Sequence, residues 1–334
     1  MRLVIVSDAW RPQVNGVVRT LEALSVELRA MGHSVGMITP DLFTNVPCPT
    51  YPEIRLAIAR PSVVARMIEN EAPDFIHIAT EGPLGIVARR YCIKRRMPFS
   101  TSFHTRFPEY VHARCRLPIS VSYAAVRWFH RPAKVTMVAT ETLRKELTGR
   151  GFTGLGLWGR GVDTNLFHPG PKDLLKGPRP SMLYVGRVAV EKNVEAFLSL
   201  DLPGTMHVVG DGPQVDRLKR DYPKVVFHGA KYGDDLAAYY AAADVFVFPS
   251  LTDTFGNVLL EALACGVPVA AFPVPGPIDV IDDPAVGALD PDLGKAIEKA
   301  LPLSSDACRR FAEAHSWRES ANQFMNNLMS LHTA

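Results

Sequence analysis

The chain has 334 residues, of which 47% are hydrophobic and 21% are charged, and its formal net charge is +3 at pH 7. This composition is typical of a folded globular protein and excludes intrinsic disorder and a collagen-like repeat. The five cysteines are widely spaced and form no CxxC pair. We therefore expect no disulfide framework and no structural zinc site, which favours a reducing cytoplasm.

The N-terminal half alternates short apolar runs with segments of helical periodicity. The first run, residues 3–6, is too short for a signal peptide and predicts a strand instead. Further strands are predicted at 35–38, 75–78, 99–102 and 135–139, and helices at 17–31, 61–70, 85–96 and 141–150.

The same alternation restarts in the second half. Strands are predicted at 182–185, 206–209, 225–227, 245–248 and 267–271, and helices at 194–200, 214–221, 234–242 and 256–265. The weakly polar stretch at 262–278 is interrupted by prolines and does not predict a membrane span. Strands that alternate with helices form parallel sheets covered on both faces. The predicted fold is α/β, with two doubly wound Rossmann-like domains that face a cleft.

Residues 169–180 contain four prolines and two glycines, a composition that predicts a linker. The expected domains are therefore 1–168 and 181–316, followed by a C-terminal helix at 317–334 that packs back on the first domain. Residues 1–170 carry 22 Lys and Arg against 13 Asp and Glu, so the first half is basic and the second acidic. A basic half suggests an anionic partner.

Ligands bind beyond the carboxyl ends of parallel strands, so site residues are expected in the loops that follow the strands. Gly186, Arg187 and Lys192 follow one strand, and a guanidinium with an ammonium group suits a diphosphate. The alternative is that these basic residues pair with nearby carboxylates. Gly210 follows the next strand, where either a ligand approach or a structural turn is possible.

A polar turn with Asp253 precedes a predicted helix that carries Glu261 eight residues later. A carboxylate on an apolar helical face needs a partner, and sugar or ribose hydroxyls are suitable ones. The alternative is a helix-capping Asp and a Glu bonded to nearby backbone.

In the first half, Asn15 and Gly16 precede a helix whose free amides favour an anion, although a plain turn is the alternative. His104 follows a strand, with Arg106 and Glu109 close in sequence, and a purely structural histidine is the alternative there. The segment around Asn15 and Gly16 is not a GxGxxG motif, so it carries no dinucleotide fingerprint. No spacing typical of metal ligands and no GxSxG, P-loop or HExxH motif occurs.

Taken together, these segments resemble the family 4 retaining glycosyltransferases with the GT-B fold. The resemblance implies that Arg187 and Lys192 hold a nucleotide diphosphate, that Glu261 binds the ribose, and that Gly16 approaches the donor phosphate. It places His104 beside the transferred sugar and implies no bound metal or cofactor. His104, Arg187, Lys192 and Asp253 are the expected catalytic residues. The expected donor site also includes Asn15, Gly186, Gly210, Thr254, Phe255, Gly256, Asn257 and Val258.

Asp253 departs from the family pattern, because it stands where the first Glu of an E-x7-E motif is usual. The side chain is one methylene shorter, which places the sugar contact at Asp253 in doubt.

The segments around residues 51–55, 104–110 and 160–167 are similar to bacterial and plastid diacylglycerol glycosyltransferases. This resemblance favours UDP-glucose or UDP-glucuronate as donor, a diacylglycerol acceptor, and a peripheral position on the inner face of the cell membrane. Basic residues interleaved with aromatics in the first domain suit an anionic membrane surface. The residues expected on the acceptor or membrane side are Arg106, Glu109, Tyr110, Arg127, Trp128 and Arg131.

Three alternatives stay open from the sequence. The chain is similar to GDP-mannose-dependent mannosyltransferases as well, and a soluble acceptor is possible. A nucleotide-sugar 2-epimerase or a non-catalytic binder shares the two-domain architecture. Nucleic acid is not expected as a partner, because no recognition motif is present.

Overall fold

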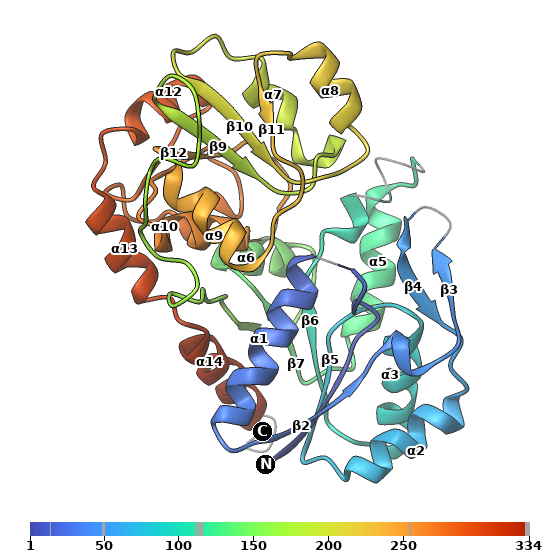
Figure 1. The fold of residues 1–334 in the computed structure, drawn as a ribbon. Helices are drawn as coiled ribbons and strands as arrows, with labels where there is room; N and C mark the ends of the chain where they lie inside the picture. Colours follow the sequence, from blue (N-terminus) through green and yellow to red (C-terminus); the bar gives the residue numbers. More distant parts are fainter. Residues whose placement is uncertain (14, 49–50, 110, 112–115, 254, 331–334) are drawn as a thin grey trace. The chain divides into compact units, whose positions relative to one another are not determined.

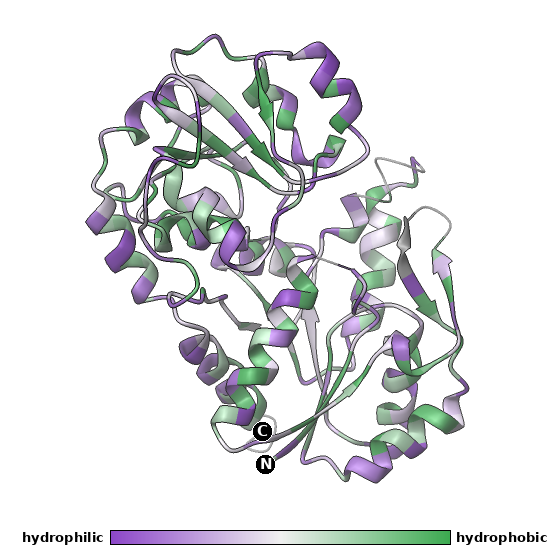
Figure 2. Cartoon of the chain, viewed as in Figure 1, coloured by the Kyte–Doolittle hydropathy of each residue, from purple (hydrophilic) through white to green (hydrophobic). Residues whose placement is uncertain are grey.

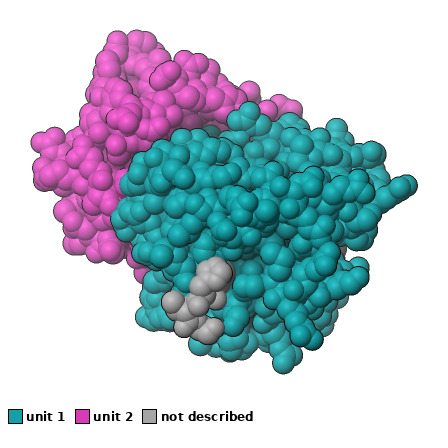
Figure 3. Space-filling view, turned by 90° about the horizontal axis from the view of Figure 1, so that it is seen from below, with its two compact units in different colours: residues 1–159, 317–334 teal, residues 160–316 magenta. Residues whose placement is uncertain are grey.

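The structure is a computed structural model, and it describes residues 1–13, 15–48, 51–109, 111, 116–253 and 255–330. Two compact units divide the chain: unit 1 comprises residues 1–159 and 317–334, and unit 2 comprises residues 160–316 (Figure 3). The division falls after Gly159, ahead of the linker predicted at 169–180. Val162 and Phe167 are buried in the core of unit 2, and Val162 pairs with Ser316 at the other end of that unit. Packing therefore assigns the segment before the linker to the second unit.

Unit 1 is built on a six-stranded parallel sheet with the order β2-β1-β5-β6-β7-β8. A small antiparallel hairpin, β3 with β4, lies beside it. The strands are β1 (Arg2–Val6), β2 (Ser34–Ile38), β3 (Asn45–Cys48), β4 (Tyr51–Ala57), β5 (Phe75–Ile78), β6 (Ser100–Phe103), β7 (Val135–Val138) and β8 (Leu155–Leu157). The helices are α1 (Gly16–Ala30), η1 (Pro40–Leu42), α2 (Pro61–Glu71), α3 (Pro83–Arg95), α5 (Ile119–His130), α6 (Glu141–Gly149) and α14 (Trp317–Met329).

Unit 2 is built on a six-stranded parallel sheet of its own, with the order β11-β10-β9-β12-β13-β14. Its strands are β9 (Ser181–Val185), β10 (Thr205–Val209), β11 (Val226–Phe227), β12 (Val245–Phe248), β13 (Val269–Ala271) and β14 (Gly287–Leu289). Its helices are η2 (Val190–Lys192), α7 (Val194–Leu198), α8 (Val215–Asp221), α9 (Gly233–Ala242), α10 (Asn257–Ala264), α11 (Pro277–Val280), α12 (Leu293–Ala300) and α13 (Ser305–Glu313). The prediction of two Rossmann-like α/β domains is confirmed.

Most strands are apolar on both faces because helices cover both sides of each sheet, whereas β6 carries the buried polar residues Ser100, Thr101 and Ser102. Successive residues of β1 point to opposite faces. Leu3 and Ile5 pack with α1 and α14, whereas Val4 and Val6 pack with α2 and α3. The C-terminal helix α14 thus lies beside α1 (Figure 1). Figure 2 shows the apolar strands in green inside each unit and the hydrophilic residues in purple, mostly on the surrounding helices.

Several elements lie outside the predicted pattern, among them the β3–β4 hairpin and helix α5. Helix α5 escapes the periodicity argument because it is apolar on two sides: Tyr123 and Phe129 are buried, whereas Val121 and Trp128 are exposed. Among the described residues, no helix is both long enough and apolar enough to cross a bilayer.

Candidate functional site

At the carboxyl edge of the unit 2 sheet, the loops after β9 and β10 meet backbone to backbone. The Gly186 amide donates to the Val209 carbonyl at 3.0 Å. A Cβ atom on Gly210 would lie 1.8 Å from the Gly186 oxygen, and one on Gly212 would lie 2.3 Å from the Val188 oxygen. Side chains cannot be accommodated at these positions, so the two loops form a continuous backbone surface that a ligand can approach closely.

The two basic residues of this edge have different surroundings. Arg187 is exposed, and its carbonyl oxygen accepts a 2.8 Å hydrogen bond from the buried Tyr184 hydroxyl. Lys192, at the end of η2, places its Nζ 2.5 Å from Oδ1 of Asp253. The structure therefore brings together two residues that are 61 positions apart in the sequence.

Two further hydrogen bonds hold this ion pair in place. The Asn193 side-chain amide donates to the Pro249 carbonyl at 3.1 Å, and the Thr252 hydroxyl donates to the Glu191 carbonyl at 3.4 Å. The other carboxylate oxygen of Asp253, Oδ2, is buried and has no hydrogen-bond partner among the described residues. A buried acceptor of this kind suits a ligand hydroxyl.

The loop after Asp253 leads directly into α10. Gly256 has a φ of 88° and precedes the helix, a conformation that favours glycine. Phe255, Gly256, Asn257 and Val258 are partly buried at this helix start, where free amides favour an anion or a hydroxyl oxygen. Thr254, which the sequence also placed here, lies outside the described residues.

Glu261 lies on the buried side of α10, with 6% of its surface exposed. Its Oε2 accepts a 2.9 Å hydrogen bond from the hydroxyl of Tyr240, a buried residue of α9. Burial, with a smaller contribution from the Glu261 charge, raises the pKa of the neighbouring Cys265 thiol to about 12. A thiol with this pKa is protonated at neutral pH and is not a nucleophile.

In unit 1, Asn15 and Gly16 form the start of α1. The Asn15 side-chain oxygen accepts hydrogen bonds from the amides of Val17 and Val18, both at 3.0 Å. It is therefore the N-cap of the helix, as the turn alternative expected. Gly16 is exposed at the first helical position, and its approach to a donor phosphate stays a prediction.

His104 lies one residue beyond β6, at the carboxyl edge of the unit 1 sheet, and is 9% exposed. Its ring meets the indole of Trp158 edge to face, with the ring centroids 5.6 Å apart. The loop after β8 thus supplies one wall of the His104 environment.

Arg106 and Glu109 belong to a network of side chains rather than to an open surface. Arg106 is 8% exposed, and its guanidinium lies 2.8 Å from Glu146 and 3.6 Å from Glu109. The Tyr123 hydroxyl donates to Glu109 at 2.7 Å. Burial disfavours the Glu146 carboxylate, but the hydrogen bond and charge of Arg106 outweigh it and lower the pKa of Glu146.

The other predicted acceptor-side residues lie on or near α5. Arg127, Trp128 and Arg131 are exposed, and Trp128 is 53% accessible. The guanidinium of Arg89, from α3, lies 4.0 Å above the Trp128 ring, so the two helices meet at this residue. Tyr110 lies outside the described residues.

Asp8 is a residue at the unit 1 edge that the sequence analysis missed. Its carboxylate accepts hydrogen bonds from the Leu84 amide at 2.8 Å and the Gly85 amide at 3.1 Å, which caps α3. Burial raises the pKa of Asp8 in spite of these bonds. An acidic residue directly after the first strand was the available signal.

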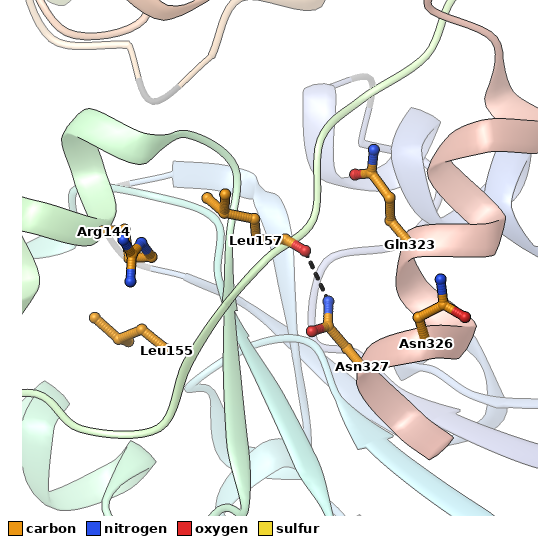
Figure 4. A pocket seen from close by; sticks show the side chains of 6 residues that line it. All are labelled: Arg144, Leu155, Leu157, Gln323, Asn326 and Asn327. Carbon is orange, nitrogen blue, oxygen red and sulfur yellow. Dashed lines mark hydrogen bonds between the residues drawn. The ribbon is translucent and has the colours of Figure 1, made fainter. Parts of the chain in front are cut away.

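A cavity of about 380 Å³ lies between β8 and α14 of unit 1, away from the residues described above. Figure 4 shows its lining of Arg144, Leu155, Leu157, Gln323, Asn326 and Asn327. Asn327 donates to the Leu157 carbonyl at 2.7 Å, and Arg144 is paired with Glu141. These polar groups have protein partners, so the cavity carries no ligand assignment.

No cluster of three or more His, Cys, Asp or Glu side chains suited to a metal ion occurs in the described part of the chain. Independence from metal stays a prediction.

Both halves of the chain match known families. Residues 14–166 match the model described as Glycosyltransferase Family 4, and residues 179–306 match Glycosyl transferases group 1. A GDP-mannose-dependent alpha-mannosyltransferase of Mycobacterium tuberculosis is 31% identical over 87% of this chain and 84% of its own length. A sulfoquinovosyl transferase of Arabidopsis thaliana is 30% identical over 91% of this chain and 68% of its own length.

A third relative is the alpha-monoglucosyldiacylglycerol synthase of Streptococcus pneumoniae, 27% identical over 97% of this chain and 83% of its own length. Among solved structures, a sucrose-phosphate synthase from Thermosynechococcus elongatus has a TM-score of 0.77 at 21% identity, with both chains covered completely. The Anabaena protein HepE in complex with UDP-glucose has a TM-score of 0.75 at 17% identity, covering 99% of this chain and 100% of that one. These likenesses show the fold.

The fold and the matched models define a glycosyltransferase built from two Rossmann-like units. This chain belongs to glycosyltransferase family 4.

Proposed function

We propose that this glycosyltransferase moves a hexose from a nucleotide diphosphate sugar to diacylglycerol at an anionic membrane surface, with retention of the anomeric configuration. UDP-glucose and UDP-glucuronate are the favoured donors. The name of the Streptococcus relative, alpha-monoglucosyldiacylglycerol synthase, supports a glycolipid product.

The observation that carries the acceptor proposal is the outer side of α5. Val121, Ala124, Ala125 and Trp128 are all exposed and recur at i, i+3, i+4 and i+7. We call these four residues the α5 face. This spacing places them along one side of the helix, where an apolar stripe in water is normally buried.

Positively charged side chains surround the α5 face, and they can attract the negatively charged headgroups of anionic lipids. Arg127 and Arg131 are exposed on or just after α5, and Arg90 and Lys94 are exposed on α3. Arg89 joins the two helices by donating to the carbonyls of Phe129 and Trp128, each at 2.9 Å. Each basic residue near an anionic membrane contributes about 1 kcal/mol, and the exposed Trp128 suits the interfacial layer. The proposed position is peripheral, on the inner face of the cell membrane.

The proposed reaction uses the residues of the unit 2 edge to stabilise the leaving group. The acceptor hydroxyl oxygen attacks C1 of the sugar as the bond from C1 to the diphosphate oxygen breaks, and the hydroxyl proton passes to that oxygen. Arg187 and Lys192 stabilise the charge that develops on the diphosphate. Asp253 and the first amides of α10 hold the sugar hydroxyls, and Glu261 holds the ribose.

A donor panel tests the proposal. The enzyme is incubated with diacylglycerol in mixed micelles and with UDP-glucose, UDP-glucuronate, UDP-galactose or GDP-mannose, and the lipids are analysed by mass spectrometry. We expect a hexosyl-diacylglycerol from a UDP-sugar. A product from GDP-mannose alone would favour the mannosyltransferase alternative, which the Mycobacterium relative supports. Donor turnover without glycolipid would contradict the lipid acceptor, and release of an epimerised sugar would favour an isomerase.

Vesicle sedimentation tests the membrane surface separately. Trp128→Ala and Arg131→Gln should each weaken binding to phosphatidylglycerol vesicles, with little binding to phosphatidylcholine vesicles in any case. Tyr232→Ala is the matched control, because Tyr232 is an aromatic residue of unit 2 that is 57% exposed. Equal binding of all four proteins to anionic vesicles would contradict the assignment of this surface.

A further inference from the structure

The carboxyl ends of β6, β7 and β8 place three residues in register. Phe103 pairs with Val138, and Val138 pairs with Leu157. His104, Ala139 and Trp158 are the residues that directly follow these three strands. Because Ala139 is small, the His104 and Trp158 rings approach each other beside it, with their centroids 5.6 Å apart and their planes at 68°.

The C-terminal helix α14 fixes the orientation of Trp158. The indole Nε1 donates to the Ser320 hydroxyl at 3.1 Å, and that hydroxyl donates to the Gly159 carbonyl at 2.8 Å. The Gly159 amide in turn donates to the side-chain oxygen of Gln323 at 3.0 Å. Helix α14 therefore holds both the indole and the backbone that carries it.

This arrangement restrains the indole strongly. Trp158 is fully buried, and the ring of Phe324, also from α14, lies 4.9 Å from it. A buried indole N–H requires a partner, and its loss favours a rotated or shifted ring. A shift of Trp158 moves the wall against which His104 packs.

We propose that Trp158 and Ser320 are positioning residues for His104, so that the last helix of the chain sets the geometry of a residue 216 positions earlier. The proposal rests on the proposed function, in which His104 contacts the transferred sugar. Neither Trp158 nor Ser320 touches substrate. Their contribution is to hold the imidazole plane where the sugar is bound.

Ser320→Ala and Trp158→Phe test this, singly and together. We expect each to lower kcat about tenfold, because small displacements of a positioned group reduce turnover strongly. The KM for the nucleotide sugar should stay within about twofold, since most of the expected donor contacts, those of the diphosphate and the ribose, lie in unit 2. The double variant should be no worse than either single variant, because both break the same hydrogen bond.

The imidazole resonance of His104 provides a second readout that needs no substrate. It is assigned by its loss in His104→Gln. The ring current of Trp158 acts on it, so both variants should shift it. Ser25→Ala is the matched control: Ser25 is a buried helical serine of unit 1, bonded to the Leu21 carbonyl at 2.7 Å. It should change neither the resonance nor kcat.

An unmoved His104 resonance in Ser320→Ala would overturn the proposal, and so would a moved resonance with unchanged kcat. A wild-type enzyme that forms no glycolipid contradicts the proposed acceptor but leaves the resonance test intact. The two failures are therefore distinguishable.

Discussion

Both units are built on a six-stranded parallel sheet, but their carboxyl edges are constructed differently. In unit 2 the loops after β9 and β10 meet through backbone, because Gly186, Gly210 and Gly212 leave no space for side chains between them. In unit 1 the edge is made of side chains: the Asp8 carboxylate caps α3, and the His104 ring packs on Trp158. We therefore expect the unit 2 loops to be disrupted when a side-chain atom is added to one of these glycines. The unit 1 edge should be disrupted when one partner of a side-chain contact is removed.

The largest effect on donor binding and stability is expected from adding one methyl group where the loops after β9 and β10 meet. In Gly210→Ala the Cβ atom would meet the Gly186 oxygen at 1.8 Å, so the loops after β9 and β10 must separate. We expect loss of measurable donor binding and a decrease of about 3 kcal/mol in the free energy of unfolding. Calorimetric titration with UDP and GDP, with hydrogen exchange of β9 and β10, measures both.

Gly229→Ala is the control for this substitution. Gly229 also has a positive φ, 70°, but a Cβ atom there would meet nothing within 4 Å. Only the backbone strain of about 1 kcal/mol should remain. Equal loss of donor binding in both variants would show that conformation, and not close approach of the two loops, matters in unit 2.

The next effect tests the side-chain edge of unit 1. Arg106→Ala leaves Glu146 and Glu109 without the guanidinium that lies between them. We expect the free energy of unfolding to fall by about 2 kcal/mol, less than for a fully isolated buried pair because Glu146 keeps Arg150. Hydrogen exchange should rise in α6 and α5, while vesicle binding should be retained. Lost vesicle binding at unchanged stability would instead place Arg106 on the membrane side.

The same difference explains how much the sequence could predict. Most strands of both sheets are short, largely apolar runs, so their positions and the fold class followed from pattern. The three-residue strands β8 and β14 were not predicted. The glycines, Lys192 and Asp253 of unit 2 lie directly after strands, where position alone indicates a ligand. Lys192 and Asp253 form an ion pair because the strands that precede them, β9 and β12, are neighbours in the sheet. The sequence left pairing of the basic residues with a nearby carboxylate open as an alternative.

The unit 1 edge was less predictable because its partners are distant in sequence. Trp158 and Ser320 are 162 positions apart, and no local periodicity connects them. Arg106 was assigned to the acceptor side by its neighbours in sequence, whereas Glu146 from α6 determines its surroundings. Helix α5 was not predicted because the α5 face adds a second apolar side, which obscures the 3.6-residue period.

A pH effect distinguishes the interiors of the units. His207 of β10 is fully buried, and its ring stacks on His228 with a 3.1 Å contact between Nδ1 and Nε2. Burial, with smaller contributions from the His228 and Arg179 charges, lowers the pKa of His207 to about 4. Between pH 6.5 and 4 the unfolded chain therefore binds a proton that the folded chain does not. Stability conferred by the neutral ring is complete above pH 6.5 and is lost as the pH falls.

We expect unit 2 to lose about 2 kcal/mol of stability between pH 7 and pH 5 through this residue. His207→Gln should flatten that part of the profile, measured by urea unfolding followed through hydrogen exchange of β10. Titrating groups that do not contact His207 cancel in the comparison with wild type, whereas His228, which contacts it, adds to the difference. A parallel pH dependence in both proteins would show that His207 titrates normally in the folded state.

The smallest effect concerns Glu261, where unit 2 also relies on a side-chain contact. Tyr240→Phe removes the hydroxyl that donates to the Glu261 carboxylate at 2.9 Å but leaves the carboxylate itself in place. A hydrogen bond of this kind contributes about 1 kcal/mol, so we expect the Kd for UDP or GDP to rise about fivefold. Glu261→Gln should weaken binding further, because the ribose hydroxyls then lose a charged acceptor. If Tyr240→Phe leaves the Kd unchanged while Glu261→Gln abolishes binding, α10 alone orients the carboxylate. The Tyr240 side chain would then not be needed for nucleotide binding in unit 2. If neither changes the Kd, Glu261 is a structural residue of the α9–α10 contact and the ribose is held elsewhere.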